Sequence, residues 1–312
     1  METTAMKGTE YPGFFDLQVN GFGGVDFQQP ALDQAALTRA VDGLLSHQTD
    51  RILFTLITDR IDALCAKLVN IETLRARDPK LARVIVGYHI EGPYMSPKTG
   101  YHGAHDPALM KAPDIAEFEL LQEAAQGRIR LITLAPEQPN SAEFIRHITQ
   151  RKVVAAIGHS EADDRQIDEA IAAGLSMCTH LGNGIPVQLH RHDNIMQRLL
   201  ARDELVASFI PDGIHIPGPV LRNLVRAKPR DKVIFTTDCM AAAGAGPGRF
   251  RIGRFDVDVG VDGVVREPGK PNFAGSSLTM DRAAENIRTF LGWSEAEVHA
   301  ACAQRVADSL GM

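Results

Sequence analysis

Four residues with metal-binding or acid–base side chains each follow a short apolar run of the sequence. They are Glu91, His159, His180 and Asp238. The first three supply a carboxylate oxygen and two imidazole nitrogens, a set that suits Zn²⁺ or Fe²⁺ and leaves one position for water. Such a metal lowers the pKa of its water from about 15.7 toward about 7, which supplies hydroxide at neutral pH. Asp238 could then take the proton and deliver it to a leaving group. The pattern predicts a metal-assisted hydrolase.

A single histidine at the end of a strand is more often a hydrogen-bonded structural residue than a ligand, so the prediction depends on several such residues together. His89 lies two positions before Glu91 on the same side of its strand and is a rival ligand. We interpret it as a residue that supports the ligands. His47, His147 and His299 fall within helical segments and are interpreted as surface or hydrogen-bonded residues.

Eight apolar or β-branched runs are candidate strands. They are Phe14–Val19, Arg51–Thr58, Val84–Ile90, Ile129–Leu134, Val153–Gly158, Leu175–Thr179, Leu205–Pro211 and Val233–Thr237. Segments with helical periodicity separate them, which is typical of parallel strands joined by crossover helices, and eight repeats favour a closed (β/α)8 barrel over an open sheet. In such a barrel the chemistry lies at the carboxyl ends of the strands.

The region Arg249–Pro268 departs from this pattern. Its apolar residues alternate with period two around Asp262 and Gly263, which predicts a β-hairpin excursion after the eighth strand. Two helical segments, Thr279–Leu291 and Ser294–Leu310, follow it. Because no linker, internal repeat or low-complexity tract interrupts the chain, the sequence predicts a single α/β domain over residues 1–312.

The composition is that of a soluble globular protein. Hydrophobic residues make up 44% and charged residues 23% of the 312 residues, and the net charge of −6 argues against a nucleic-acid partner. No apolar run approaches the roughly 20 residues that span a bilayer. The four cysteines have no paired spacing, and the first ten residues lack the apolar core of a secretory signal. We therefore expect reduced thiols, a cytoplasmic location and no membrane association.

Eight ordered motifs carry a resemblance to a known family. They are Pro12-Gly-Phe-Phe-Asp-Leu-Gln-Val-Asn-Gly, His89-Ile-Glu-Gly-Pro-Tyr, Gly103-Ala-His-Asp-Pro, Ile157-Gly-His-Ser, Thr179-His-Leu-Gly-Asn-Gly-Ile-Pro, Asp212-Gly-Ile-His, Thr236-Thr-Asp-Cys-Met-Ala-Ala-Ala-Gly and Phe273-Ala-Gly-Ser-Ser-Leu-Thr-Met. Together they resemble the N-acetylglucosamine-6-phosphate deacetylases of the amidohydrolase superfamily. The matches extend from about residue 12 to the C-terminus, and eight motifs in order are far more specific than any one of them.

The resemblance implies a deformed (β/α)8 barrel that hydrolyses the acetamido group of N-acetyl-D-glucosamine 6-phosphate to D-glucosamine 6-phosphate and acetate. It implies one divalent metal per chain, Zn²⁺ with Fe²⁺ as the alternative, held by Glu91, His159 and His180. Asp238 is then the catalytic acid and base, and His105 orients or polarises the substrate carbonyl.

The resemblance also implies a set of substrate contacts and a homodimer. The contacts are Asn183, Gly184, Arg191, His215, Phe273, Ala274 and Gly275, and we predict Gln18, Asn20 and Ala104 as further substrate contacts. Among them, Arg191 aligns with an arginine that reaches the phosphate in the neighbouring subunit's site. The expected partner is a small amino-sugar phosphate.

Two departures from the family pattern stand out. Family members carry a small β-sandwich domain built from both ends of the chain, and here only eleven residues precede Pro12, so we expect that domain to be missing or vestigial. On the phosphate side, His190-Arg191-His192 replaces the usual Gly-Arg-Glu, so Arg191 is aligned by spacing alone.

The first predicted strand ends in Gln18 and Asn20, where many amidohydrolases have His-x-His and hold a second metal. Residues two apart on a strand point to the same face. Carboxamides are poor ligands for a transition metal, so the pair predicts a single metal, bound from the third, fifth and sixth strands. The pair could bind water, sugar hydroxyls or the acetamido group, or the two side chains could satisfy one another and the nearby backbone.

Two other functions stay open from the sequence. One is an amidohydrolase for another N-acyl amino sugar or an N-acyl amino acid. The other is a non-catalytic sugar-phosphate-binding paralogue, against which the retention of Asp238 beside the ligand-type residues argues. The glycines around Asn20 and Gly182 could cradle a phosphate or simply make tight turns.

Overall fold

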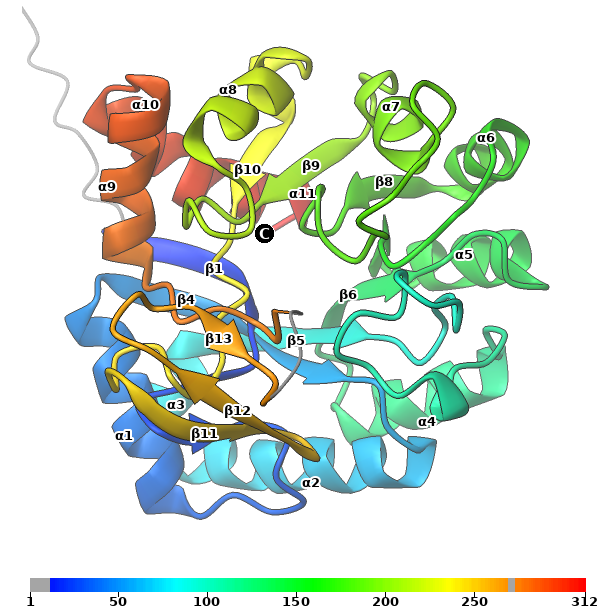
Figure 1. Cartoon of the computed structure of the whole chain (residues 1–312). Helices are drawn as coiled ribbons and strands as arrows, with labels where there is room; N and C mark the ends of the chain where they lie inside the picture. The colour runs from blue at the N-terminus through cyan, green and yellow to red at the C-terminus, as the bar shows by residue number, and fades with distance from the viewer. Residues whose placement is uncertain (1–11, 269–272) are drawn as a thin grey trace, which may run out of the picture.

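The computed structural model describes residues 12–268 and 273–312. Eight parallel strands pair in the order β1, β4, β5, β6, β7, β8, β9, β10. Their bounds are Phe14–Val19, Thr49–Ile57, Ile85–Glu91, Ile129–Leu134, Val154–Ile157, Leu175–Cys178, Val206–Phe209 and Val233–Phe235. The strands surround a common centre, and most helices form a ring outside them (Figure 1). The predicted (β/α)8 barrel is confirmed, with each strand on its predicted run.

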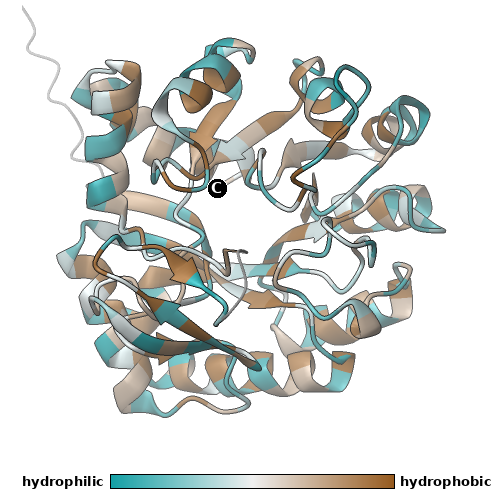
Figure 2. Cartoon of the chain, viewed as in Figure 1, coloured by the Kyte–Doolittle hydropathy of each residue, from teal (hydrophilic) through white to brown (hydrophobic). Residues whose placement is uncertain are grey.

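Helices connect successive strands on the outer side of the barrel. They are α1 (Gln34–Ser46), α2 (Ile61–Arg77), α3 (Pro79–Val84), α4 (Ile115–Ala124), α5 (Ser141–Gln150), α6 (Asp164–Ala173), α7 (Ile195–Leu200) and α8 (Gly218–Arg226), with short 3₁₀ turns at Pro107–Leu109 and Arg230–Lys232. In α6, Asp163 and Gln166 form a capping box and Gly174, with φ of 116°, ends the helix. Apolar residues predominate on the strands, whereas the outer faces of the helices are mostly polar (Figure 2).

The interior of the barrel changes from apolar to polar along the strands. Leu53, Leu131, Met177 and Ile234 belong to one buried apolar cluster. Two positions further along each strand, and so on the same face, a hydroxyl residue follows. These buried residues are Thr55, Thr133, Thr179 and Thr236. The hydroxyl layer separates the apolar end of the barrel from the carboxyl ends of the strands.

The C-terminal segment covers the apolar end. It consists of α9 (Met280–Leu291), α10 (Glu295–His299), a π-helical turn (Ala300–Gln304) and α11 (Arg305–Ser309), which confirms the two predicted helical segments. Val306, Ala307 and Leu310 pack into the same apolar cluster as the strand residues Phe15 and Leu17. The barrel is therefore closed at its amino end, and the carboxyl end remains for chemistry.

Side-chain and loop contacts join β10 back to β1. The Asp16 carboxylate on β1 accepts hydrogen bonds from the hydroxyl groups of Thr236, at 2.5 Å, and of Thr237. Val19 pairs with Cys239 in a parallel bridge beyond the end of β10. These contacts form the seam of the barrel, which lies beside the carboxyl end of β1.

The excursion after β10 is a three-stranded antiparallel sheet, made of β11 (Gly248–Ile252), β12 (Phe255–Val259) and β13 (Val265–Arg266). The turn at Asp262 and Gly263 joins β12 to β13, as the alternation predicted. A second turn, at Gly253, was not predicted and makes three strands rather than two. The sheet contacts the short hairpin of β2 (Gly21–Phe22) and β3 (Val25–Asp26), where the backbone N–H of Gly253 donates to the Asp26 carboxylate at 3.0 Å.

All four cysteines are unpaired, in keeping with the reduced thiols that the sequence predicts. Within the described part of the chain, we find no helix with the length and apolar character needed to cross a bilayer.

Candidate active site

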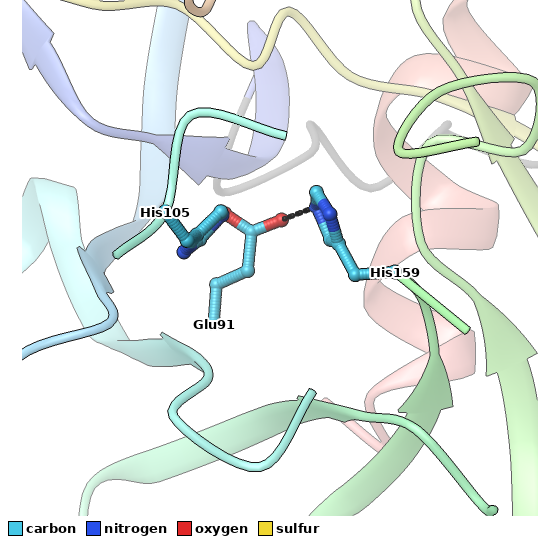
Figure 3. A group of neighbouring side chains, drawn as sticks. All are labelled: Glu91, His105 and His159. Carbon is cyan, nitrogen blue, oxygen red and sulfur yellow. Dashed lines mark ion pairs between the residues drawn. The ribbon is translucent and has the colours of Figure 1, made fainter. Parts of the chain in front are cut away.

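Glu91 is the centre of a buried polar cluster at the carboxyl ends of the strands. It is the last residue of β5, and its side chain is only 3% exposed. Its Oε1 lies 2.9 Å from Nε2 of His180 and 3.4 Å from Nε2 of His159, and its Oε2 lies 3.6 Å from Nε2 of His105. Glu91, His105 and His159 each offer a donor atom within 4.8 Å of the others, close enough to share a metal ion (Figure 3).

The two histidines predicted as ligands also lie against each other. Nε2 of His159 and Nε2 of His180 are 3.2 Å apart. Nδ1 of His159 is 2.7 Å from the carbonyl oxygen of Tyr101, so Nδ1 carries the proton and Nε2 keeps its lone pair. The structure thus brings together the three donor atoms of Glu91, His159 and His180.

Three of the predicted site residues have a left-handed backbone conformation. The φ angles are 52° for His159, 29° for His180 and 50° for Asp238. Non-glycine residues adopt this region at an energetic cost, and such residues cluster at active sites. They come two or three residues after the ends of β7, β8 and β10.

The charges within the cluster depend on one another. Burial disfavours the ionised form of Glu91, but the neighbouring imidazoles of His159 and His180 outweigh burial and hold the pKa of Glu91 well below its usual value. Burial also opposes protonation of His180, whereas the Glu91 carboxylate raises its pKa above the usual value. Nε2 of His180, 2.9 Å from Oε1 of Glu91, is thus placed to donate to the carboxylate, and a metal bound there would take the place of that proton.

His105 has a different hydrogen-bonding pattern. Its Nδ1 accepts from the backbone N–H of Thr58 at 3.4 Å and lies 2.9 Å from the Thr58 hydroxyl. Burial lowers the pKa of His105 to about 3, so the ring is neutral. A neutral ring that accepts at Nδ1 carries its proton on Nε2, the atom that faces Glu91. His105 thus presents a hydrogen-bond donor to the site.

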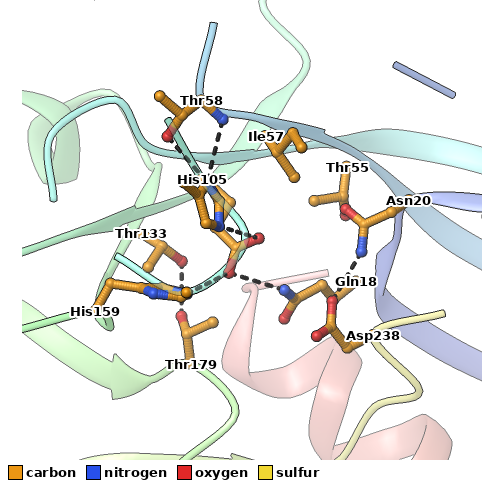
Figure 4. A network of polar contacts seen from close by, with 12 residues as sticks. Gln18, Asn20, Thr55, Ile57, Thr58, His105, Thr133, His159, Thr179 and Asp238 are labelled. Carbon is orange, nitrogen blue, oxygen red and sulfur yellow. Dashed lines mark hydrogen bonds and ion pairs between the residues drawn. The ribbon is translucent and has the colours of Figure 1, made fainter. Parts of the chain in front are cut away.

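Asp238 follows β10 and lies on the opposite side of the cluster from β5. Its Oδ1 accepts a hydrogen bond from Nδ2 of Asn20 at 2.8 Å (Figure 4). Burial, and next the negative charge of Glu91, raise the pKa of Asp238 to about 7. A carboxyl group with a pKa near neutrality can both accept and return a proton at physiological pH.

The carboxamide side chains of Gln18, on β1, and of Asn20, just after β1, face this cluster. Nε2 of Gln18 donates to Oε1 of Glu91 at 3.0 Å, and Asn20 donates to Asp238. The remaining amide oxygens, Oε1 of Gln18 and Oδ1 of Asn20, are buried and have no partner among the described residues. The side chains therefore do not satisfy one another, and each has an acceptor that a bound molecule could use.

His89, the rival ligand, lies deeper in the barrel. Its Nε2 is 2.7 Å from the hydroxyl of Thr133, which in turn is 2.6 Å from the hydroxyl of Thr179. His89 thus belongs to the hydroxyl layer beneath Glu91.

Gln18 lies on β1, and the other predicted substrate contacts lie outside the eight barrel strands. Nδ1 of His215 is 2.5 Å from Asp212, and its ring centre is 5.0 Å from that of Phe273.

Ala104 and Ala274 pack in one apolar cluster, and Gly275 lies close to Met240 and to the Asp238 carbonyl. Asn183 and Gly184 lie three and four residues after His180, and Gly184 approaches the His159 ring. Arg191 is exposed in the loop before α7 and has no hydrogen bond or ion pair with the described residues.

Two residues at the site were not identified from the sequence. Thr58 holds His105, and its position just after β4 was a signal that a strand-end search could have used. Tyr101 acts through its backbone carbonyl. Every residue has such a group, so the residue type could not identify this contact.

The fold and the cluster define the class of protein: a (β/α)8 barrel of the amidohydrolase type, with a buried carboxylate and imidazole group able to bind a metal. No family model matches the chain. The chain is, however, 31% identical over 303 residues to the N-acetylglucosamine-6-phosphate deacetylase of Bacillus subtilis, which covers 96% of this chain and 75% of that protein. It belongs to the N-acetylglucosamine-6-phosphate deacetylase family.

Two further relatives bear on the substrate. The N-acetylgalactosamine-6-phosphate deacetylase of Escherichia coli O157:H7 is 32% identical over 289 residues, which cover 92% of this chain and 74% of that protein. A variant N-acetyl-D-glucosamine-6-phosphate deacetylase of Mycobacterium smegmatis has been solved in complex with N-acetyl-D-glucosamine-6-phosphate. That structure superposes with a TM-score of 0.86 at 30% identity, covering 97% of this chain and 78% of that one.

Proposed function

We propose that this chain hydrolyses the N-acetyl amide of N-acetyl-D-glucosamine 6-phosphate to D-glucosamine 6-phosphate and acetate. The observation that carries the proposal is the buried Asp238 carboxyl group, with its pKa raised to about 7, beside the cluster of Glu91, His159 and His180. Such a pairing of a metal-binding donor set with a separate proton carrier suits amide hydrolysis. Membership of the deacetylase family supports it.

The donor set fits one divalent metal. Glu91 is a carboxylate, His159 has a free lone pair on Nε2, and the three donor atoms lie within 3.4 Å of one another in the pairs given above. Glu91, His159 and His180 would hold the metal, with Zn²⁺ the first candidate and Fe²⁺ the second. When bound, the metal supplies a Lewis acid that polarises the amide carbonyl and activates water.

The chain's own residues then handle protons and hydrogen bonds. Asp238, as carboxylate, accepts a proton from the attacking water, and as carboxylic acid it delivers that proton to the leaving amine nitrogen. The Nε2–H of His105 donates to the carbonyl oxygen of the amide, on which negative charge develops. Asn20 holds the Asp238 carboxylate in place through its Nδ2.

The remaining contacts would bind the sugar phosphate. The free acceptor oxygens of Gln18 and Asn20 suit sugar hydroxyls or the acetamido N–H. Ala104, Phe273, Ala274 and Gly275 would cover the sugar, His215 would contact it, and Asn183 and Gly184 would approach its phosphate. The exposed Arg191, which has no hydrogen bond or ion pair with the described residues, would reach the phosphate in the neighbouring subunit of a homodimer.

A second candidate substrate is N-acetyl-D-galactosamine 6-phosphate. It is favoured by the relative of 32% identity that bears that activity in its name. The two sugars differ only in the orientation of one hydroxyl group, so the same acid–base residues would serve both.

The test combines metal content with acetate release from a small panel of N-acetyl sugars and their 6-phosphates. We expect one metal per chain and turnover of the 6-phosphates well above that of the free sugars. Two tightly bound metals would contradict the role assigned to Gln18 and Asn20. Absence of any acetate release after addition of Zn²⁺ or Fe²⁺ would refute the hydrolase.

The phosphate role of Arg191 has its own test. Arg191→Ala should reduce the preference for the 6-phosphate, because the side chain would neutralise phosphate charge. Arg226→Ala is the matched control, since Arg226 is also exposed but is the last residue of α8 and is not among the predicted substrate contacts. An unchanged preference in Arg191→Ala would show that the phosphate is bound by other groups.

A further inference from the structure

The imidazole ring of His159 lies close against two glycines. A Cβ atom added to Gly103 would lie 2.9 Å from Cε1 of the ring, and one added to Gly184 would lie 2.7 Å from Nδ1. Both glycines have left-handed φ angles, 58° and 61°. Non-bonded atoms do not approach a Cβ this closely without displacement, so a side chain at either glycine would push the ring.

The loop that carries Gly103 also sets the tautomer of His159. The Tyr101 carbonyl, two residues before Gly103, accepts from Nδ1 of His159 at 2.7 Å. This contact directs the proton to Nδ1 and leaves Nε2 free toward Glu91. The same loop therefore determines both the position of the ring and the nitrogen that can bind a metal.

Glu137 restrains His159 from the backbone side. Glu137 follows β6, and its carboxylate accepts from the hydroxyl of Ser160 at 2.6 Å and from the backbone N–H of Glu161 at 2.8 Å. Ser160 and Glu161 are the two residues after His159, whose φ of 52° is unfavourable for a side-chain-bearing residue. The two hydrogen bonds hold the turn that maintains this strained conformation.

We propose that Gly103 and Glu137 are positioning residues that fix Nε2 of His159 for metal binding. Gly103 leaves room for the ring at one orientation, and Glu137 fixes the backbone from which the ring projects. Neither residue contacts the donor atoms of the cluster itself. The inference rests on the proposed function in one respect, because it takes His159 as a metal ligand.

The first test compares two glycine substitutions. Gly23 has nearly the same φ as Gly103, 59° against 58°, but a Cβ added to Gly23 would meet nothing within 4 Å. Gly103→Ala and Gly23→Ala thus introduce the same backbone strain, and only Gly103→Ala presses on His159. Gly184 is not used, because it also lies among the proposed substrate contacts.

The readout is Zn²⁺ affinity, measured by competition with a chromogenic chelator, together with urea unfolding of the metal-free proteins. We expect Gly103→Ala to weaken Zn²⁺ binding by about 10- to 100-fold, as loss of a ligand-orienting group does. Gly23→Ala should change it by less than about 2-fold while costing similar stability. Equal Zn²⁺ affinities in the two variants would overturn the role of Gly103.

The second test does not depend on whether the Gly103→Ala variant folds well. Glu137→Gln replaces one acceptor oxygen by an NH₂ group, so one of the two donors after His159 loses its partner. Glu161→Gln is the control, because it alters the surface ion pair with Lys98 and leaves the Glu161 backbone N–H in place. We expect at least about 10-fold weaker Zn²⁺ binding in Glu137→Gln only. Unchanged affinity in Glu137→Gln would overturn its role.

His159→Ala separates the inference from the proposed function. Loss of Zn²⁺ binding in His159→Ala, with wild-type affinity in Gly103→Ala and Glu137→Gln, overturns only the positioning roles. Retention of Zn²⁺ in His159→Ala overturns the ligand role of His159, and the inference with it.

Discussion

The amide nitrogen Nδ2 of Asn20 lies 2.8 Å from Oδ1 of Asp238, across the seam where the end of β1 meets the residues after β10. The two residues are 218 positions apart in the chain. Burial and the charge of Glu91 raise the pKa of Asp238, and the hydrogen bond from Asn20 acts in the opposite direction. The pair therefore links the closure of the barrel to the protonation of the proposed acid–base residue.

Substitution of Asn20 should shift the pH dependence of turnover. Asn20→Leu removes the donor, so the ionised form of Asp238 loses stabilisation and its pKa rises. Because the proposed base must be ionised, activity falls as the pH falls through this pKa, and the acidic limb of kcat/KM should move to higher pH. One lost hydrogen bond of about 1 kcal/mol corresponds to roughly 0.7 pH units.

Gln18→Leu is the control for the Asn20 profile. It removes the neighbouring carboxamide, whose donor faces Glu91 rather than Asp238. A displacement of the acidic limb in Gln18→Leu as large as that in Asn20→Leu would mean that general loss of polarity, and not the Asn20 contact, sets the profile.

Asp238→Asn should remove the chemical step and preserve binding. The amide cannot accept the proton from water, so we expect kcat to fall by about 10²- to 10⁴-fold or more. Metal content and the affinity for substrate should stay close to those of the wild type. Single-turnover acetate release and metal analysis measure the two effects separately, and loss of the metal would make Asp238 a ligand instead.

His105→Gln distinguishes a hydrogen-bond donor from a metal ligand. His105 lies close enough to Glu91 and His159 to share a metal, but its Nε2 carries the proton. We therefore expect kcat to fall by about 10²- to 10³-fold, as for loss of one donor to a developing oxyanion, with little change in Zn²⁺ affinity. His159→Gln serves as the comparison, in which Zn²⁺ binding should be lost; equal losses of Zn²⁺ in both would make His105 a ligand.

Asp16→Ala should destabilise the seam. The carboxylate of Asp16 accepts from two hydroxyl groups and from the backbone N–H groups of Gln18 and Thr237, all in the buried interior. Its removal leaves these donors without a partner, which should lower the free energy of unfolding by about 3 kcal/mol or more in urea titrations. Thr236→Val, which removes one of the hydroxyl donors, should cost about 1 kcal/mol, and an equal cost for both would contradict the central role of Asp16.

Asp26 should make stability depend on pH. Its carboxylate accepts from Gln28 and from Gly253 in the turn of the three-stranded sheet, and burial raises its pKa to about 6. The folded state thus favours the protonated form of Asp26. The contribution of this protonation to the free energy of unfolding is full below about pH 4 and is lost as the pH rises through about 6.

The measurement is the difference in unfolding free energy between the wild type and Asp26→Asn. The side chain of Asn is neutral at every pH, so this difference should change by up to about 3 kcal/mol between pH 4 and pH 7, to the disadvantage of the wild type. Asp33→Asn, at the exposed cap of α1, is the control, because Asn caps a helix as well as Asp does. A difference that stays constant for Asp26→Asn would show that the carboxyl group is not perturbed.

Much of the fold followed from local patterns. The strand runs, the helical segments and the turn at Asp262 were visible because period-two and helical alternation depend on neighbouring residues. The turn at Gly253 was missed, since the alternation continues through it and its bond to Asp26 comes from residues far away in the chain. Strand ends drew attention to Glu91, His159, His180 and Asp238, because parallel strands place their carboxyl ends together.

The sequence by itself determined which chemical groups this protein carries at the ends of its strands and which family it resembles, because residue types and their spacing are written in the chain. Only the tertiary structure decided how those groups work together. The His159 tautomer comes from the Tyr101 carbonyl, and the Asp238 pKa comes from burial beside Glu91. Both depend on atoms that become neighbours only when the barrel closes, and proton positions and charge interactions depend on distance in space and not along the chain.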